Sequence, residues 1–254
     1  MSDAAEQTGE ETREETELHR RLREAGSEEL TALVERHAAE LDPPALRHVL
    51  RNPFCTAEII ERLAAERRLL SFNEVRRSLA LHPVTPEALA VRFIPTLFWR
   101  DLMELALDAR MRPTLRRSAE VQLTSRLPQL AVGEKMSIAR RAGAGILSQL
   151  RHDPSPQVIA ALLDNPRLTE GLLAPVVNGR TTPPAILDLI AADRRWGVRY
   201  ALRLSLVRNP STPLKTAWRL LEALRRIDLK PVAADPRLPE ALRKRARVLL
   251  GEVK

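Results

Sequence analysis

Arginine side chains recur at matching places in two parts of this sequence, and they are its clearest candidates for binding. Of the 41 basic residues, five are lysine and the rest are arginine. When residues 41–123 are aligned on residues 168–250 by a shift of 127, arginine meets arginine at six pairs of positions. A guanidinium is planar, permanently charged and able to hold a carboxylate or phosphate through two parallel hydrogen bonds.

Matching positions in stacked repeats lie on one surface, so the pairs predict a basic strip along a concave face that attracts phosphate or an acidic protein surface. Its predicted members are Arg76, Arg92, Arg116, Arg203, Arg219 and Arg243. The alternative is structural. Arg110 and Arg237 each lie two residues after an aspartate, and they could pair with it or bond carbonyls at a helix end. The pairs at 76/203 and 92/219 are the strongest candidates for binding.

Two of the three tryptophans are candidates for stacking on a base or on a partner's side chain, Trp99 and Trp218. Trp196 lies in a motif that recurs in helical repeats, so we expect it to pack between neighbouring helices. No other residue type forms a catalytic pattern. The one cysteine, Cys55, excludes a disulfide framework, and the five histidines have no metal-ligand spacing. Glycine-rich phosphate loops and nucleophile elbows are missing too. We therefore expect no catalytic residue, no metal and no cofactor.

The elements that must position these side chains are short helices separated by proline-containing corners. A proline cannot continue a helix, and it disfavours helical geometry in the residue before it. Helices are therefore predicted to end at Asn52, His82, Asn165 and Asn209. A threonine after each proline can cap the next helix, which predicts caps at Thr56, Thr85, Thr169 and Thr212. Pro86 and Pro213 are predicted to be first helical residues. Apolar residues between corners follow the helical period, and no alternation typical of strands is sustained.

A long internal duplication organises these helices. Residues 41–123 align without gaps on residues 168–250, and 27 of the 83 positions are identical. Helices this short cannot bury an apolar stripe alone, so they must stack. The sequence predicts an all-α, right-handed α-solenoid of paired helices over residues 27–254. Its two superunits are expected at about residues 41–167 and 168–250.

The first residues have a different composition. Residues 1–17 contain seven acidic residues and one arginine, and they lack an apolar run. We therefore expect residues 1–26 to be an acidic, largely disordered tail. It serves either to keep the protein in solution or as an autoinhibitory strip on the basic body. The acidic start lacks the layout of a signal peptide, and no apolar stretch could span a bilayer, so we expect a cytoplasmic protein.

The string from Asp193 to Ala201 contains Trp196, Val198 and Arg199, and Asn209-Pro210-Ser-Thr-Pro213 follows it. This sequence resembles the leucine-rich repeat variant group of the HEAT-like helical repeats. The resemblance implies a curved α-solenoid with a binding role. The founding type of that group carries a cysteine-ligated iron–sulfur cluster, which Cys55 alone cannot supply.

A more distant resemblance is to the HEAT-like alkylpurine DNA glycosylases, which have a basic concave face, tryptophans and an aspartate near the lesion. Phe98-Trp-Arg-Asp101 is similar to such a pocket, although Asp101 recurs as Asp228 where the tryptophan does not. A structural aspartate would recur in this way, whereas a catalytic one need not.

These observations favour a non-enzymatic binding or scaffold module that presents an arginine-rich concave surface to an acidic protein partner. The alternative is a DNA-binding HEAT-like protein, at the extreme a glycosylase-like enzyme. The oligomeric state is left open by the sequence.

Overall fold

A computed structural model describes residues 16–252, and across that range the chain is all α-helical with no strand. The chain divides into two compact units, Met1–Leu123 (unit 1) and Thr124–Lys254 (unit 2). Each unit contains one copy of the duplicated segment, residues 41–123 in unit 1 and 168–250 in unit 2. The prediction of short helices and no strands is confirmed for the described residues.

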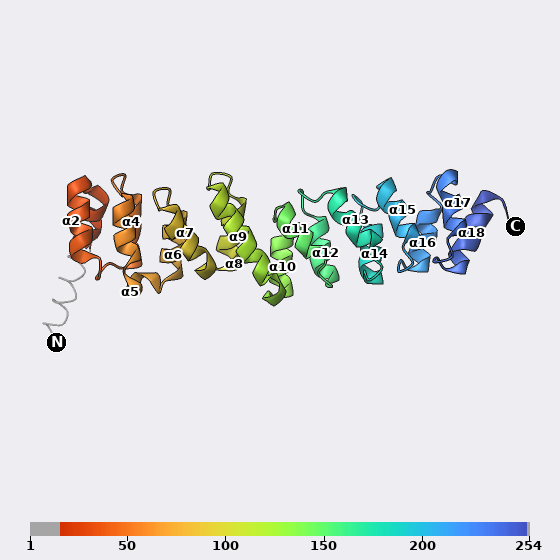
Figure 1. Cartoon of the computed structure of the whole chain (residues 1–254), viewed down its shortest axis with the longest axis horizontal. Helices are drawn as coiled ribbons and strands as arrows, with labels where there is room; N and C mark the ends of the chain where they lie inside the picture. The colour runs from red at the N-terminus through yellow and green to blue at the C-terminus, as the bar shows by residue number, and fades with distance from the viewer. Residues whose placement is uncertain (1–15, 253–254) are drawn as a thin grey trace. The chain divides into compact units, whose positions relative to one another are not determined.

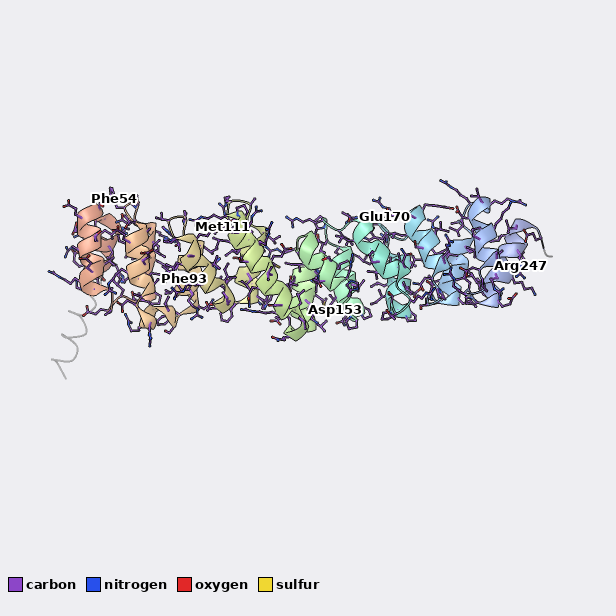
Figure 2. All side chains as sticks on the ribbon, viewed as in Figure 1. Phe54, Phe93, Met111, Asp153, Glu170 and Arg247 are labelled. Carbon is purple, nitrogen blue, oxygen red and sulfur yellow. The ribbon has the colours of Figure 1, made fainter. Side chains whose placement is uncertain are left out.

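Unit 1 follows the chain through a series of short helices (Figure 1). They are α2 (Ser27–His37), α3 (Pro43–Arg51), α4 (Ala57–Ala64), α5 (Arg67–Leu70), α6 (Asn73–Leu81), α7 (Glu87–Phe93), the 3-10 helix η1 (Ile94–Thr96), α8 (Trp99–Leu107) and α9 (Pro113–Arg126). Helices α2 and α4 pack together, as do α3 and α6, and α6 and α7. Two of its phenylalanines differ sharply, since Phe93 is buried while Phe54, at the corner after α3, is half exposed (Figure 2).

Unit 2 continues with the 3-10 helix η2 and nine α-helices of 7 to 11 residues. They are η2 (Leu127–Gln129), α10 (Val132–Ala139), α11 (Ala144–Leu150), α12 (Pro156–Leu163), α13 (Glu170–Asn178), α14 (Pro184–Ala192), α15 (Tyr200–Arg208), α16 (Leu214–Leu221), α17 (Arg226–Ala234) and α18 (Glu240–Leu250). Its last ordered helix ends on Gly251, whose φ of 78° is the left-handed conformation that glycine adopts without strain.

The helices of unit 2 form two layers. Helices α10, α12, α14, α16 and α18 pack each against the next, and α11, α13, α15 and α17 do the same. Trp196, in the turn between α14 and α15, is 2% exposed, and its Nε1 donates to the carbonyl of Leu163 at 3.1 Å. The prediction that Trp196 packs between helices is therefore confirmed.

The predicted proline-containing corners are present, and three of the four predicted helix ends are correct. Asn52, His82 and Asn209 are the residues at which helices end, while α12 ends at Leu163, two residues before Asn165. Thr56 and Thr169 cap the following helices as expected.

The predicted caps at Thr85 and Thr212 are wrong. Their hydroxyls donate backwards, each at 2.6 Å, to the carbonyls of Leu79 and Leu206. Pro86 and Pro213 occupy the cap position with extended ψ values of 136° and 132°, so neither is a first helical residue. A buried hydroxyl finds a free carbonyl at the end of the preceding helix, and this bond replaces the cap.

At three corners a buried asparagine side chain hydrogen-bonds the turn one repeat earlier. Asn165 is fully buried, and its Nδ2 donates to the carbonyls of Ala139 at 2.7 Å and Ala142 at 3.1 Å. Its Oδ1 accepts the backbone N–H of Arg167 at 2.7 Å. Asn52 and Asn209 repeat the arrangement. Each amide satisfies carbonyls that a helix end would otherwise leave buried and unpaired.

Arginines make the same kind of tie elsewhere. Three of them each bond two backbone carbonyls 27 to 30 residues earlier, and these are Arg68 on Ala39 and Leu41, Arg112 on Pro83 and Thr85, and Arg195 on Asn165 and Leu168. Arg68 and Arg195 are a 127-residue pair, and their bonds to Leu41 and Leu168 are matched as well. We call these asparagines and arginines carbonyl clamps.

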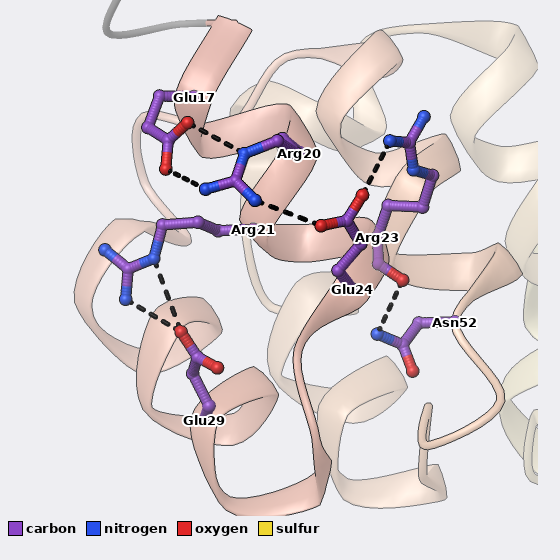
Figure 3. A network of polar contacts seen from close by, with 7 residues as sticks. All are labelled: Glu17, Arg20, Arg21, Arg23, Glu24, Glu29 and Asn52. Atoms are coloured by element: carbon purple, nitrogen blue, oxygen red, sulfur yellow. Dashed lines mark hydrogen bonds and ion pairs between the residues drawn. The ribbon is translucent and has the colours of Figure 1, made fainter.

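The ordered chain begins earlier than the predicted tail allows. Residues 16–24 are helical, and Leu22 in this segment is fully buried. Arg20 pairs with Glu17 and Glu24, while Arg21 reaches Glu29 in α2 (Figure 3). This helix lies before the predicted boundary at residue 26, and the buried Leu22 anchors it. The expectation for residues 1–15 lies outside the described residues.

Among residues 16–252, no helix is both long enough and apolar enough to cross a membrane.

Candidate anion-binding surface

The six arginines of the predicted strip lie on different layers of helices. Arg76 and Arg203 are in α6 and α15, Arg92 and Arg219 in α7 and α16, and Arg116 and Arg243 in α9 and α18. In unit 2, α15 belongs to one layer, whereas α16 and α18 belong to the other. The concave strip itself stays a prediction.

Arg76 and Arg203 are engaged with the backbone. Arg76 Nη1 donates to the carbonyls of Leu70 at 2.5 Å and Ser71 at 3.1 Å. Arg203 makes the matching bond, from Nη2 to the carbonyl of Val198 at 3.3 Å, at the 127-residue equivalent of Ser71. The Nε atoms of both arginines are buried without a partner among the described residues. These contacts favour the structural role that the sequence left open.

Arg116 and Arg243 resemble them, since both are partly buried and the Nε of each is buried without a partner in the described chain. Arg243 also pairs with Glu240 in the first turn of α18. A guanidinium already paired with a carboxylate has less to offer an external anion.

Arg92 and Arg219 are exposed. Arg219 Nη2 lies 3.4 Å from the carbonyl of Ala191 at the end of α14. Arg92 lines a groove of about 570 Å³ between α4, α5 and α7, together with Arg67 and apolar side chains such as Leu70 and Leu89. Both arginines therefore lie at the same junction in their units, and in unit 1 the junction opens into a groove.

Trp99 and Trp218 keep part of their surface accessible. Trp218 is 41% exposed, and Trp99 is half-buried with Arg100 over its ring at 5.3 Å. Asp101 is held from α6, by Arg77 Nε at 2.9 Å and by Asn73 Nδ2 at 3.2 Å. Its counterpart Asp228 accepts a hydrogen bond from Tyr200, the counterpart of Asn73. The recurring aspartate thus joins neighbouring helices in both units, which favours the structural reading of Asp101.

Arg110 and Arg237 pair with the preceding aspartates, as the structural alternative proposes. Arg237 donates from Nε at 2.9 Å and Nη2 at 2.7 Å to Asp235, and Arg110 holds Asp108 in the same way. The hydrogen bonds from Arg237 lower the pKa of Asp235 to about 2. Asp235 takes the position of the clamping asparagines, but a carboxylate cannot donate to carbonyls, so it binds the nearby arginine instead.

The charge divides unevenly between the units. Unit 1 has 18 basic and 22 acidic residues, whereas unit 2 has 23 basic and 11 acidic residues. The net formal charges are −4 and +12, which add to the +8 of the whole chain. A surface that attracts acidic or phosphorylated partners is therefore expected in unit 2 and not in unit 1.

Within unit 2, three arginines meet at a small hollow of about 110 Å³. Arg180 follows α13, Arg208 ends α15, and Arg237 follows α17, and Asn178 and Ser205 complete the polar lining. Helix α15 lies between α13 and α17, so the three arginines come from neighbouring repeats (Figure 1). Arg180 and Arg208 are exposed, and no carboxylate among residues 16–252 pairs with either.

Sequence reasoning missed Arg180 and Arg208 because it searched for arginines that recur. The 127-residue shift places Pro53 opposite Arg180 and Leu81 opposite Arg208, so neither has a counterpart in unit 1. The signal that could have identified them is a basic residue beside a corner that occurs in one copy of the duplication and not in the other. The uneven charge of residues 1–123 and 124–254 was also readable from the sequence.

A scan against family models found none that matches the chain, and neither the curated proteins nor the solved structures gave a match. The chain is an all-helical protein of short, pairwise-packed helices, consistent with a helical repeat. The resemblance to the leucine-rich repeat variant group therefore rests on sequence strings such as residues 193–213 alone.

Proposed function

We propose that this protein is a helical-repeat binding module, a right-handed α-solenoid, whose second unit binds an acidic protein segment. The supporting observation is the +12 net charge of unit 2, with arginines beside its turns that no carboxylate of the described chain neutralises. Arginine forks on carboxylates would supply affinity and register, and the net charge would speed association.

The arginines of unit 2 serve two purposes in this proposal. Those that clamp carbonyls, such as Arg195, or hold an aspartate, such as Arg237, are committed to the fold. Arg180 and Arg208 have no such partner and remain for a ligand. Arg219 has one weak backbone contact at 3.4 Å, so it is a further contact candidate from the predicted strip.

The same charge supports a second candidate function, nucleic-acid binding. Such binding would fall steeply with salt, because each neutralised phosphate releases counterions. The glycosylase form of this idea needs a free aspartate, and Asp101 is occupied by Arg77 and Asn73.

The test compares an acidic peptide with a DNA duplex by fluorescence anisotropy over a series of salt concentrations. We expect the peptide to bind, and Arg208→Gln and Arg180→Gln to weaken binding about 3- to 10-fold each, as loss of one hydrogen bond of about 1 kcal/mol implies. The matched control is Arg47→Gln, which removes an exposed arginine from α3 in unit 1. Binding of DNA alone would favour the second function, and no binding of either at low salt would refute both.

A further inference from the structure

The arginine-lined hollow of unit 2 has the composition of a site for one compact anion. Arg180, Arg208 and Arg237, together with Ser205 and Asn178, line a space of about 110 Å³. That space has room for a group of several heavy atoms, about the size of a phosphate. Arginine is preferred in such sites, because its planar fork can donate two hydrogen bonds to one anion.

The backbone around the hollow is held in place before any ligand arrives. Asn209 Nδ2 donates to the carbonyl of Gly179 at 2.9 Å, and Ser211 Oγ donates to the carbonyl of Arg180 at 2.8 Å. The turn that carries Arg180 is thus fastened to the corner after Arg208. A site with a fixed backbone loses less entropy when it binds.

The side chain of Arg237 is also oriented in advance. Asp235 accepts from its Nε and Nη2, which leaves Nη1 for a ligand. The charge of Arg208 contributes to lowering the pKa of Asp235, so these two groups lie within electrostatic reach. With three arginines and one aspartate, the immediate surroundings have a formal charge of +2.

The duplication provides an internal comparison. The matching place in unit 1 is a hollow lined by His82, Arg110, Met111 and other residues of the same two corners. At the matching sequence positions Leu81 replaces Arg208 and Pro53 replaces Arg180, whereas the pairing of Arg110 with Asp108 repeats that of Arg237 with Asp235. Both units therefore have a hollow at these corners, but the exposed arginines Arg180 and Arg208 are present in unit 2 and have no counterpart in unit 1.

We propose that Arg180, Arg208 and Arg237, with Ser205 and Asn178, form a binding site for a dianionic phosphoryl group. The proposal deepens the proposed function and rests on it for the source of the group, a phosphorylated residue in the acidic partner segment. Two charges on the ligand match the formal +2 of the hollow, whereas a carboxylate or a phosphodiester has only one.

The first experiment uses inorganic phosphate as the probe, with the full-length protein at constant ionic strength. NMR signals of backbone amides and arginine Nε–H groups are followed during the titration. We expect saturable shifts at residues 178–180, 205–211 and 237, and affinity at least about tenfold weaker in Arg208→Leu, which installs the residue of unit 1. Arg180→Gln should act likewise, while Arg47→Gln in unit 1 should change the affinity less than twofold.

The second experiment compares an acidic peptide containing one serine with its phosphoserine form. We expect phosphorylation to tighten binding about tenfold in the wild type and to have no effect in Arg208→Leu. If the plain peptide binds but neither phosphorylation nor phosphate has an effect, the phosphoryl site is refuted and the proposed function stands. If neither peptide binds but phosphate saturates the hollow, the site stands and the protein partner is refuted. Equal losses in Arg208→Leu and Arg47→Gln would show unspecific attraction and refute the site, as would phosphate shifts spread evenly over unit 2.

Discussion

The carbonyl clamps predict that one buried amide contributes a large share of stability, and Asn165→Ala tests this. The substitution removes the two bonds to Ala139 and Ala142 and the bond from the backbone of Arg167. Each contributes about 1 kcal/mol net, and buried groups left without a partner cost more, so the expected loss is about 3 kcal/mol. For a unit of this size that corresponds to a fall in Tm of about 6–12 °C.

Urea unfolding and thermal unfolding followed by circular dichroism measure this loss, and hydrogen exchange locates it. Exchange should accelerate at the amide of Arg167, whose acceptor is deleted. Asn165→Asp keeps the shape and the acceptor but removes both donated bonds, so it should also destabilise. Gln157→Ala, at an exposed position of the preceding helix α12, is the control and should change stability by less than about 0.5 kcal/mol. A loss below 1 kcal/mol in Asn165→Ala would refute the clamp argument.

Four further predictions concern single side chains. His82 Nε2 lies 2.9 Å from the carbonyl of Leu50, a contact that asparagine makes at other corners. His82→Asn should therefore change the free energy of unfolding by less than about 1 kcal/mol, whereas His82→Ala should lower it by about 1–2 kcal/mol in urea unfolding. Trp196→Phe, which loses one buried N–H bond, should cost about 1–2 kcal/mol by the same measurement. Burial raises the pKa of Cys55 to about 11, so its reaction with a thiol reagent at pH 8 should be far slower than in urea. The Asp235 carboxylate should titrate near pH 2 by carbon NMR, and Arg237→Gln should return it towards 3.8. Because the folded pKa is depressed, its stabilising effect is present above pH 4 and lost as the pH falls towards 2.

The helical class and its corners could be predicted from the sequence because proline acts locally. Asn52, His82 and Asn209 end helices for reasons contained in a few neighbouring residues. Thr85 and Thr212 were misread because the choice between capping forwards and bonding backwards depends on which group is buried. That choice depends on tertiary packing, which local sequence does not specify.

The candidate site could be predicted only in part. Charge and residue type pointed to arginine as the candidate binding group, but whether a guanidinium is free depends on which backbone carbonyls the fold brings near it. Arg76, within α6, donates to nearby backbone carbonyls, while Arg208, the last residue of α15, makes no such bond within the described chain. The search for recurring arginines selected Arg76 and missed Arg208. A residue that the fold requires recurs in both copies more readily than one that serves a ligand.

The carbonyl clamps have a consequence for how such a chain can lengthen or shorten over time. Each reaches back by about one repeat, as Arg68 does to Leu41 and Arg195 to Leu168. Insertion or loss of a whole repeat leaves every clamp donor facing an equivalent backbone carbonyl. A gain of half a repeat would leave both the donor and the carbonyl without a hydrogen-bond partner. We therefore expect duplication of whole repeats to be tolerated. The gap-free alignment of 83 positions agrees with this expectation.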